Sequence, residues 1–175
     1  VWLRDLSELD RIADSAIRLV REEVAGPEGR EPVDLAALTR EIVDELGEIG
    51  LAVTQRGAVA DAMVNARPLA IKRALRNLIE NACIHGGGGT VSLQVDGPRL
   101  RVIIGDEGPG IPAELLDRVF EPFFRVDPAR RKTAPGAGLG LAIAREIIEQ
   151  EGGTLTIANR PSGGLEQVVS LPAAT

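Results

Sequence analysis

The stretch NLIENACIHGGGG, residues 77–89, joins an apolar helix pattern to a run of four glycines. Apolar residues recur at helical spacing and predict a helix over 68–85. Asn77 and Asn81 are one turn apart and share a face of this helix. Asparagine disfavours helix interiors, so the pair indicates either a solvated polar face or a ligand site. This face differs from the apolar stripe of the helix, which consists of Ile71, Leu75, Leu78 and Ala82.

The same stretch contains His85, the only histidine of the chain. Its place at the predicted helix end favours a structural role. A metal site here is not expected, because no second histidine exists and the only cysteine, Cys83, lies two residues away without ligand spacing. The apolar surroundings of Cys83 predict packing over reactivity.

Length and charge narrow the possible functions. The 175 residues, 44% hydrophobic, are enough for one compact domain. A formal net charge of -6 argues against nucleic acid as a partner. A single cysteine cannot form an internal disulfide, and no apolar run reaches the roughly 18 residues of a membrane span. These features predict a cytoplasmic domain, whose parent protein could still be anchored in a membrane.

Periodicity and turn residues predict the order of the elements. An amphipathic helix over 1–24 and a Gly/Pro-rich linker place a boundary near residue 30, which divides the chain into 1–30 and 31–175. After Asp34, a predicted helix cap, helices are expected over 35–48, 68–85 and 138–151, and strands near 50–55, 58–64, 90–95, 99–105, 153–158 and 165–171. This mixture predicts an α/β two-layer sandwich with helices packed on one face of a mixed sheet.

A second motif, LRVIIGDEGPGIP over 100–112, places Asp106 at the end of an apolar strand. A carboxylate only accepts hydrogen bonds, which suits the exocyclic amine of adenine and disfavours guanine. Gly108 and Gly110 would let the backbone approach a flat base. A tight turn explains this short pattern equally well.

A third motif, PGAGLGLAIAREIIEQ over 135–150, leads glycines into an amphipathic helix. Free N–H groups at a helix start can bind phosphate, although a flexible loop is the alternative. A dinucleotide-binding turn is excluded, because polar residues and no strand precede the glycines. The segment is therefore expected to form a mobile lid.

Four stretches together resemble the nucleotide-binding boxes of the catalytic domain of sensor histidine kinases. They are NLIENA (77–82), DEGPGIP (106–112), FEPFFR (120–125) and GAGLGLAIA (136–144). This domain belongs to the GHKL superfamily, shared with DNA gyrase, a heat-shock chaperone and mismatch-repair ATPases. The resemblance covers about 31–172 and implies the Bergerat ATP-binding fold. Residues 1–24 resemble the end of the dimerisation hairpin that precedes this domain.

The resemblance implies ATP and Mg²⁺ as ligands. Asn81 would ligate Mg²⁺, Asn77 would lie beside the phosphates, and Asp106 would bind adenine; the two asparagines would be the catalytic pair. Further nucleotide contacts are implied for Gly108, Gly110, Ile111, Phe120, Arg125, Arg130, Gly136, Gly138, Leu139, Gly140 and Leu141.

The implied function is transfer of the γ-phosphate of Mg-ATP to a histidine on the dimerisation hairpin, for relay to a response regulator. The intact protein would be a homodimer. The related ATPases carry glutamate at the position of Asn77; an amide cannot act as a general base, so slow ATP hydrolysis is expected. The helix with the phosphoacceptor histidine is absent from this sequence, and His85 is not the expected acceptor. The chain alone should not autophosphorylate.

Several positions depart from the family pattern. Ile84 replaces a common basic residue near the phosphates, and Arg130, Arg131 and Lys132 either compensate or form a solvated basic run. Glu151 and Gln167 are expected to affect packing. The grouped phenylalanines, Phe120, Phe123 and Phe124, form either a satellite core or a hinge for the lid, and the two are compatible.

Two other functions remain open. Ile84 favours a degenerate, non-catalytic nucleotide-binding or protein-interaction module. A serine kinase of the anti-sigma type shares the fold, but the predicted helix over 1–24 argues against it.

Overall fold

A computed structural model of the chain describes residues 15, 21, 29–57, 62–126 and 138–174. Apart from Ser15 and Arg21, the predicted N-terminal helix lies outside the described residues. So does most of the predicted lid, including Arg130, Arg131, Lys132 and Gly136.

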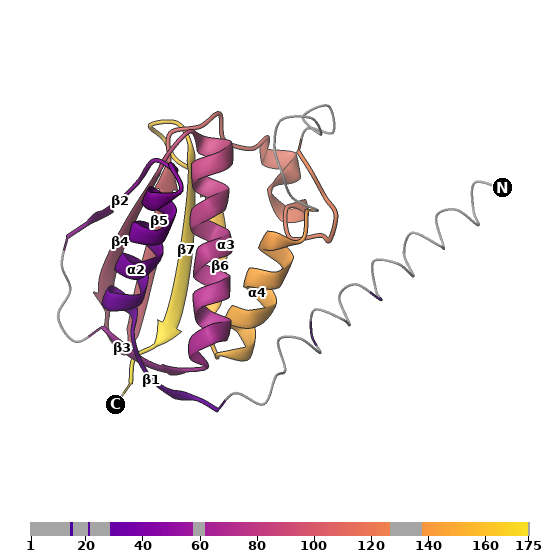
Figure 1. Cartoon of the computed structure of the whole chain (residues 1–175). Helices are drawn as coiled ribbons and strands as arrows, with labels where there is room; N and C mark the ends of the chain where they lie inside the picture. The colour runs from indigo at the N-terminus through magenta and orange to yellow at the C-terminus, as the bar shows by residue number, and fades with distance from the viewer. Residues whose placement is uncertain (1–14, 16–20, 22–28, 58–61, 127–137, 175) are drawn as a thin grey trace.

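The described strands form a mixed sheet of five in the order β2-β4-β5-β7-β6 (Figure 1). β2 runs parallel to β4, and the other neighbours are antiparallel. These strands are β2 (Val53–Arg56), β4 (Gly89–Asp96), β5 (Arg99–Asp106), β6 (Thr154–Asn159) and β7 (Leu165–Pro172). A separate antiparallel pair consists of β1 (Glu31–Asp34) and β3 (Met63–Ala66).

The helices α2 (Leu35–Glu48), α3 (Pro68–Gly86) and α4 (Gly140–Gln150) lie side by side over one face of the sheet (Figure 1). Burial along the strands alternates accordingly, because successive side chains of a strand point to opposite faces. In β7 the buried residues are Leu165, Gln167, Val169 and Leu171. The predicted two-layer α/β sandwich is therefore confirmed.

Helix α3 forms the centre of the helical layer (Figure 1), and the predicted apolar stripe is its buried face. Ile71, Leu75 and Leu78 are fully buried, and Ala82 nearly so. Pro68 opens the helix, where its missing N–H removes no hydrogen bond. Gly87, with a φ of +72°, ends it in the left-handed conformation that glycine adopts without strain. Gln167 fixes the helix to the sheet by donating from Nε2 to the carbonyl oxygen of Leu78 at 3.1 Å.

Helix boundaries were predicted better than the early strands. The Oδ1 atom of Asp34 accepts from the amides of Ala36 at 2.9 Å and Ala37 at 3.2 Å, which confirms this residue as the cap of α2. The strands expected near 50–55 and 58–64 lie instead at 53–56 and 63–66. β1 was missed, because a single buried residue, Val33, gives no alternating pattern, and only pairing with β3 defines the strand.

A buried carboxylate joins the linker, α3 and α4. The Glu151 side chain is fully buried, and its Oε1 lies 2.6 Å from Nε of Arg67, the residue before α3. Its Oε2 lies 3.2 Å from Nε of Arg30, which precedes β1. Arg67 also donates to Oε1 of Gln150 at 2.8 Å, and Arg30 to the Gln150 carbonyl oxygen. Glu151 thus acts as an ionic anchor, a stronger role than the packing expected for it.

We predict that Glu151→Gln lowers the free energy of unfolding by about 3 kcal/mol, because it leaves the poorly exposed Arg67 guanidinium without its buried counter-ion. Urea unfolding measures the change. The control is Glu149→Gln, whose exposed pair with Arg145 should contribute less than about 0.5 kcal/mol. Equal losses in the two variants would contradict the anchoring role.

Candidate functional site

Asp106 lies at the end of β5 and is almost completely buried, with 6% of its surface exposed. Its Oδ1 atom accepts from the amide of Gly108 at 2.9 Å and from the amide of Leu165 at 3.1 Å. Both hydrogen bonds that the described residues make to this carboxylate end on Oδ1, so the group is held at one oxygen while Oδ2 can accept from a ligand.

The end of α3 packs directly against this carboxylate. A Cβ placed on Gly86 would lie 2.2 Å from the Cβ of Asp106, far inside van der Waals contact. A Cβ on Gly108 would lie 2.7 Å from the Cα of Gly86. Two glycines are therefore required here by close approach of α3 to the loop after β5, a reason different from the approach to a flat base that was expected for Gly108.

The turn between β6 and β7 encloses the loop that follows Asp106. The Asn159 amide bonds both backbone groups of Ile111, accepting at Oδ1 over 2.8 Å and donating from Nδ2 over 2.6 Å. Arg160 donates from Nη1 to the Asp106 carbonyl oxygen at 2.9 Å. Sequence reasoning missed both residues; the only signal was the turn-forming composition of NRPSGG over 159–164.

The asparagine face of α3 looks toward the start of α4. Asn77 donates from Nδ2 to the carbonyl oxygen of Gly140, the first residue of α4, at 3.3 Å. Asn81 is half-buried, and within the described residues no hydrogen bond engages its amide. The structure therefore brings one asparagine to the glycine-rich helix start and leaves the amide of the other available.

The phenylalanine segment adjoins the end of the predicted lid. Phe123 has a φ of +63° and donates its amide hydrogen to the carbonyl oxygen of Gly138 at 3.0 Å. A Cβ on Gly138, whose φ is +76°, would lie 3.0 Å from the backbone of Phe123. The guanidinium of Arg118 lies 4.5 Å from the ring centre of Phe124, and that of Arg145 lies 4.8 Å from Phe120. Two of the three rings thus lie against guanidinium groups, whereas Phe123 is 43% exposed, so a satellite core and a hinge for the lid both stay predictions.

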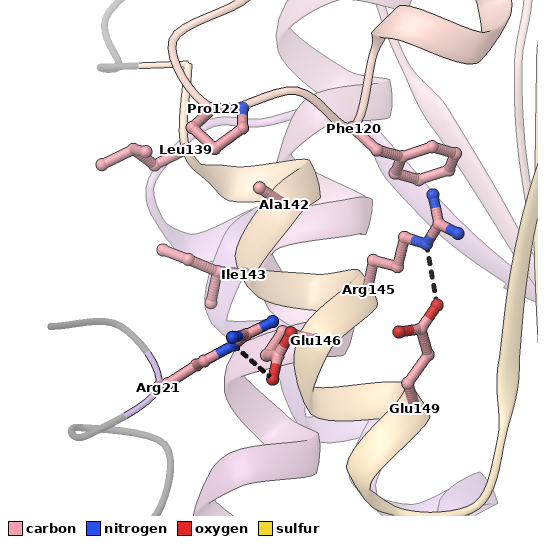
Figure 2. A pocket seen from close by; sticks show the side chains of 9 residues that line it. All are labelled: Arg21, Phe120, Pro122, Leu139, Ala142, Ile143, Arg145, Glu146 and Glu149. Atoms are coloured by element: carbon pink, nitrogen blue, oxygen red, sulfur yellow. Dashed lines mark hydrogen bonds and ion pairs between the residues drawn. The ribbon is translucent and has the colours of Figure 1, made fainter. Parts of the chain in front are cut away.

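A groove runs along the outer face of α4, as Figure 2 shows. Its lining includes two ion pairs, Arg21 with Glu146 at 3.1 Å and Arg145 with Glu149 at 2.8 Å. Of the predicted nucleotide contacts, only Phe120 and Leu139 line it. The groove is therefore separate from the buried carboxylate of Asp106.

Three consecutive residues, 83–85, follow Asn81 near the end of α3. Ile84 is 38% exposed, and His85 has an exposed side chain at the end of α3. Cys83 is buried; desolvation raises the pKa of its thiol, and the Glu80 carboxylate raises it further. A raised thiol pKa means less thiolate at neutral pH, which agrees with the packing role expected for this cysteine.

The predicted site residues thus form two groups. Asp106, Gly108, Gly110 and Ile111 gather where β5 meets the β6–β7 turn. Asn77, Gly138, Leu139, Gly140 and Leu141 gather where α3 meets the start of α4, with Phe120 beside them. Arg125 lies at the edge of the described residues.

A comparison with known protein families matches the part of the chain that contains these residues. Positions 66–175 match the family of histidine kinase-, DNA gyrase B- and HSP90-like ATPases. The chain belongs to this family. The predicted resemblance is confirmed, and the site lies in an ATPase-family domain whose sheet and helices carry the matched motifs.

Individual members of the family agree. The chain is 37% identical over 171 residues to the sensor histidine kinase GtrS of Pseudomonas aeruginosa, covering 97% of this chain and 34% of that protein. It is similar to the ATP-binding domain of PrrB from Mycobacterium tuberculosis (TM-score 0.68, 27% identity, 85% of this chain and 100% of that one). It is also similar to full-length ShkA in complex with AMPPNP (TM-score 0.70, 25% identity, 97% and 39%).

The curated relatives are longer proteins, and this chain spans about a third of the length of GtrS. Within the described part of the chain, no helix has the length and apolar character that crossing a bilayer requires.

We predict that Gly86→Ala destabilises the domain by about 1–3 kcal/mol, because the added methyl group overlaps the Asp106 side chain. Chemical unfolding provides the measurement. Gly47→Ala is the control: a Cβ there meets nothing within 4 Å, and alanine favours the helix, so this variant should gain up to about 1 kcal/mol. A neutral Gly86→Ala would show that the contact is not close in solution.

Proposed function

We propose that this chain binds ATP with its adenine against Asp106. The observation that supports this proposal most directly is the one-sided hydrogen bonding of the carboxylate: two backbone amides hold Oδ1, and Oδ2 is left to accept from the exocyclic amine. Gly108 and Gly110 would line the base pocket with Ile111. Guanine presents a carbonyl oxygen at the position of that amine, so this pocket would reject it.

The phosphates would extend toward the start of α4. Asn77 adjoins Gly140 there, and Gly136, Gly138 and Gly140 would supply backbone amides, with Leu139 and Leu141 alongside. Arg125, Arg130 and Phe120 would approach from the preceding segment. Arg131 and Lys132 are further candidates for phosphate contacts.

The residues fit Mg²⁺ only as a substrate-bound ion. Within the described residues, no group of three or more histidine, cysteine, aspartate or glutamate side chains could hold a metal. Asn81 offers one amide oxygen from α3, and Mg²⁺ readily completes its shell with phosphate oxygens and water. We therefore assign Mg²⁺ to Asn81 together with ATP, where the ion would neutralise phosphate charge.

In the longer protein we propose that residues 31–175 form the catalytic domain of a sensor histidine kinase and that residues 1–30 end its dimerisation hairpin. The domain would present the γ-phosphate to a histidine of that hairpin, and a response regulator would receive it in turn. Asn77 and Asn81 would act by positioning and charge neutralisation. Because Asn77 cannot deprotonate water, hydrolysis would be slow. The homodimer and the cytoplasmic location of this portion stay predictions.

A non-catalytic nucleotide-binding module is the second candidate. Ile84, partly exposed on α3 beside the asparagine face, brings no charge to the phosphates. In that case nucleotide would control the conformation of the lid and the choice of partner. Labelling of a supplied dimerisation hairpin by ATP would separate the two, since only a kinase transfers the phosphoryl group.

The adenine site predicts that Asp106→Asn weakens ATP and ADP binding at least about tenfold, because the amide turns a donor toward the exocyclic amine and removes a charge-assisted hydrogen bond. Calorimetric titration of ATP, ADP and GTP measures this. Asp96→Asn removes an exposed carboxylate and should leave all affinities unchanged. Absence of ATP binding to the wild type at millimolar concentration would refute the proposed function.

The magnesium assignment predicts a different pattern for Asn81→Ala. The gain in ATP affinity on adding Mg²⁺ should shrink by about tenfold, or about 1.4 kcal/mol, while AMP binding stays at the wild-type level. Asn81→Asp keeps an oxygen ligand and should retain the gain. If Asn81→Ala binds Mg-ATP like the wild type, the metal is held elsewhere.

A further inference from the structure

We propose that the turn between β6 and β7 is a positioning element of the nucleotide site, in which Asn159 holds the base-binding loop 106–111 in its working shape. This inference rests on the proposed function, because it assigns a residue to the adenine end of that site. Asn159 would not touch the reacting phosphate. Its action would pass through the backbone of the loop.

The first support is the hydrogen bonding of Ile111. This residue lies outside the strands and helices, so no regular ladder satisfies its backbone groups. The Asn159 amide bonds both of them, the N–H to Oδ1 at 2.8 Å and the carbonyl oxygen to Nδ2 at 2.6 Å. One side chain thereby replaces the strand neighbour that the loop lacks.

The second support is the fit of the adjacent glycine. Gly110 has a φ of +71°, and a Cβ there would lie 2.6 Å from Oδ1 of Asn159. The glycine therefore serves two needs at once: the left-handed backbone, and space for the amide. Loop and side chain are shaped for each other, which an incidental surface contact would not require.

The third support is that the same turn also grips the other end of the loop. Arg160 donates to the backbone carbonyl oxygen of Asp106 at 2.9 Å. The amide of Leu165 donates to the side-chain Oδ1 of Asp106 at 3.1 Å. A Cβ on Gly164 would lie 2.0 Å from that carbonyl oxygen. The turn therefore contacts the loop at both ends, at Asp106 through Arg160 and Leu165 and at Ile111 through Asn159.

This arrangement separates base binding from phosphate binding. Release of Ile111 would loosen the wall of the base pocket while the contacts of Asn77 with α4 stay in place. Loss of Asn159 should therefore reduce affinity by the same factor for every adenine nucleotide, whatever its number of phosphates. It should also reduce the preference for adenine over guanine.

The test uses the chain with Asn159→Ala, with Asn65→Ala as the control, since Asn65 is an exposed asparagine on β3. Calorimetry with AMP, ADP, ATP and GTP should show affinities for the three adenine nucleotides reduced about fivefold to tenfold in Asn159→Ala, as expected for two partly solvated hydrogen bonds. The control should match the wild type. The melting temperature, measured in parallel, should change little.

Asn159→Asp provides a second, graded test. Its carboxylate still accepts from the Ile111 amide but turns an oxygen toward the Ile111 carbonyl oxygen, where Nδ2 lay at 2.6 Å, so repulsion between the two oxygens should make the loss of affinity at least as large as in the alanine variant. Hydrogen exchange of the Ile111 amide, measured without nucleotide, should accelerate at least about tenfold in Asn159→Ala, which loses the acceptor, and less in Asn159→Asp, which keeps it.

The outcomes are distinct. Wild-type affinity and unchanged Ile111 exchange in Asn159→Ala would overturn the inference while leaving the adenine site intact. A loss that grows with the number of phosphates would also overturn it, by moving the effect to the other end of the nucleotide. A wild-type chain that binds no nucleotide would instead refute the proposed function itself, and this inference with it.

Discussion

The close approach of Gly86 to Asp106 is the constraint on which the arrangement of the site depends. It brings the last turn of α3 against the end of β5 with no side chain between them. The buried stripe of α3 fixes the helix over the sheet, so the depth at which this end lies is set by the core. The loop after Asp106 must then leave the strand beside Gly108, and the β6–β7 turn must close over it. The packing of the core therefore also sets the geometry of the proposed base pocket.

The two parts of the candidate site are held by different interactions. Around Asp106, hydrogen bonds of 2.9 and 3.1 Å hold the buried carboxylate against the backbone amides of Gly108 and Leu165. Between α3 and the start of α4, Asn77 makes one longer hydrogen bond, to Gly140 at 3.3 Å, and glycines supply the backbone. In the proposed function, the hydrogen-bonded part around Asp106 would hold the base, and the glycine-rich start of α4 would adapt to the phosphates.

Features that depend on residues close together in the chain could be predicted from the sequence, and features that depend on distant residues could not. α2 and α3 were predicted closely because their apolar periodicity, Asp34 and Pro68 are local signals. β1 was missed because it exists through its pairing with β3. Asn159 was missed for the same reason: it contacts a residue 48 positions earlier in the chain. The place of Asp106 at a strand end was predicted because the end of an apolar strand is visible in sequence, whereas Leu165, whose amide donates to its carboxylate, is 59 positions away.

The anchor at Glu151 has a mechanical consequence. It lies at the start of α3, beside Arg67, whereas Gly86 and Asp106 lie at the end of that helix. With 19 residues at about 1.5 Å each, α3 is about 28 Å long, so the anchor and the Gly86 contact hold this helix at two points that lie that far apart. Because Arg30 and Arg67 share the Glu151 carboxylate, the residues just before β1 are tied to one end of the helix whose other end packs against Asp106.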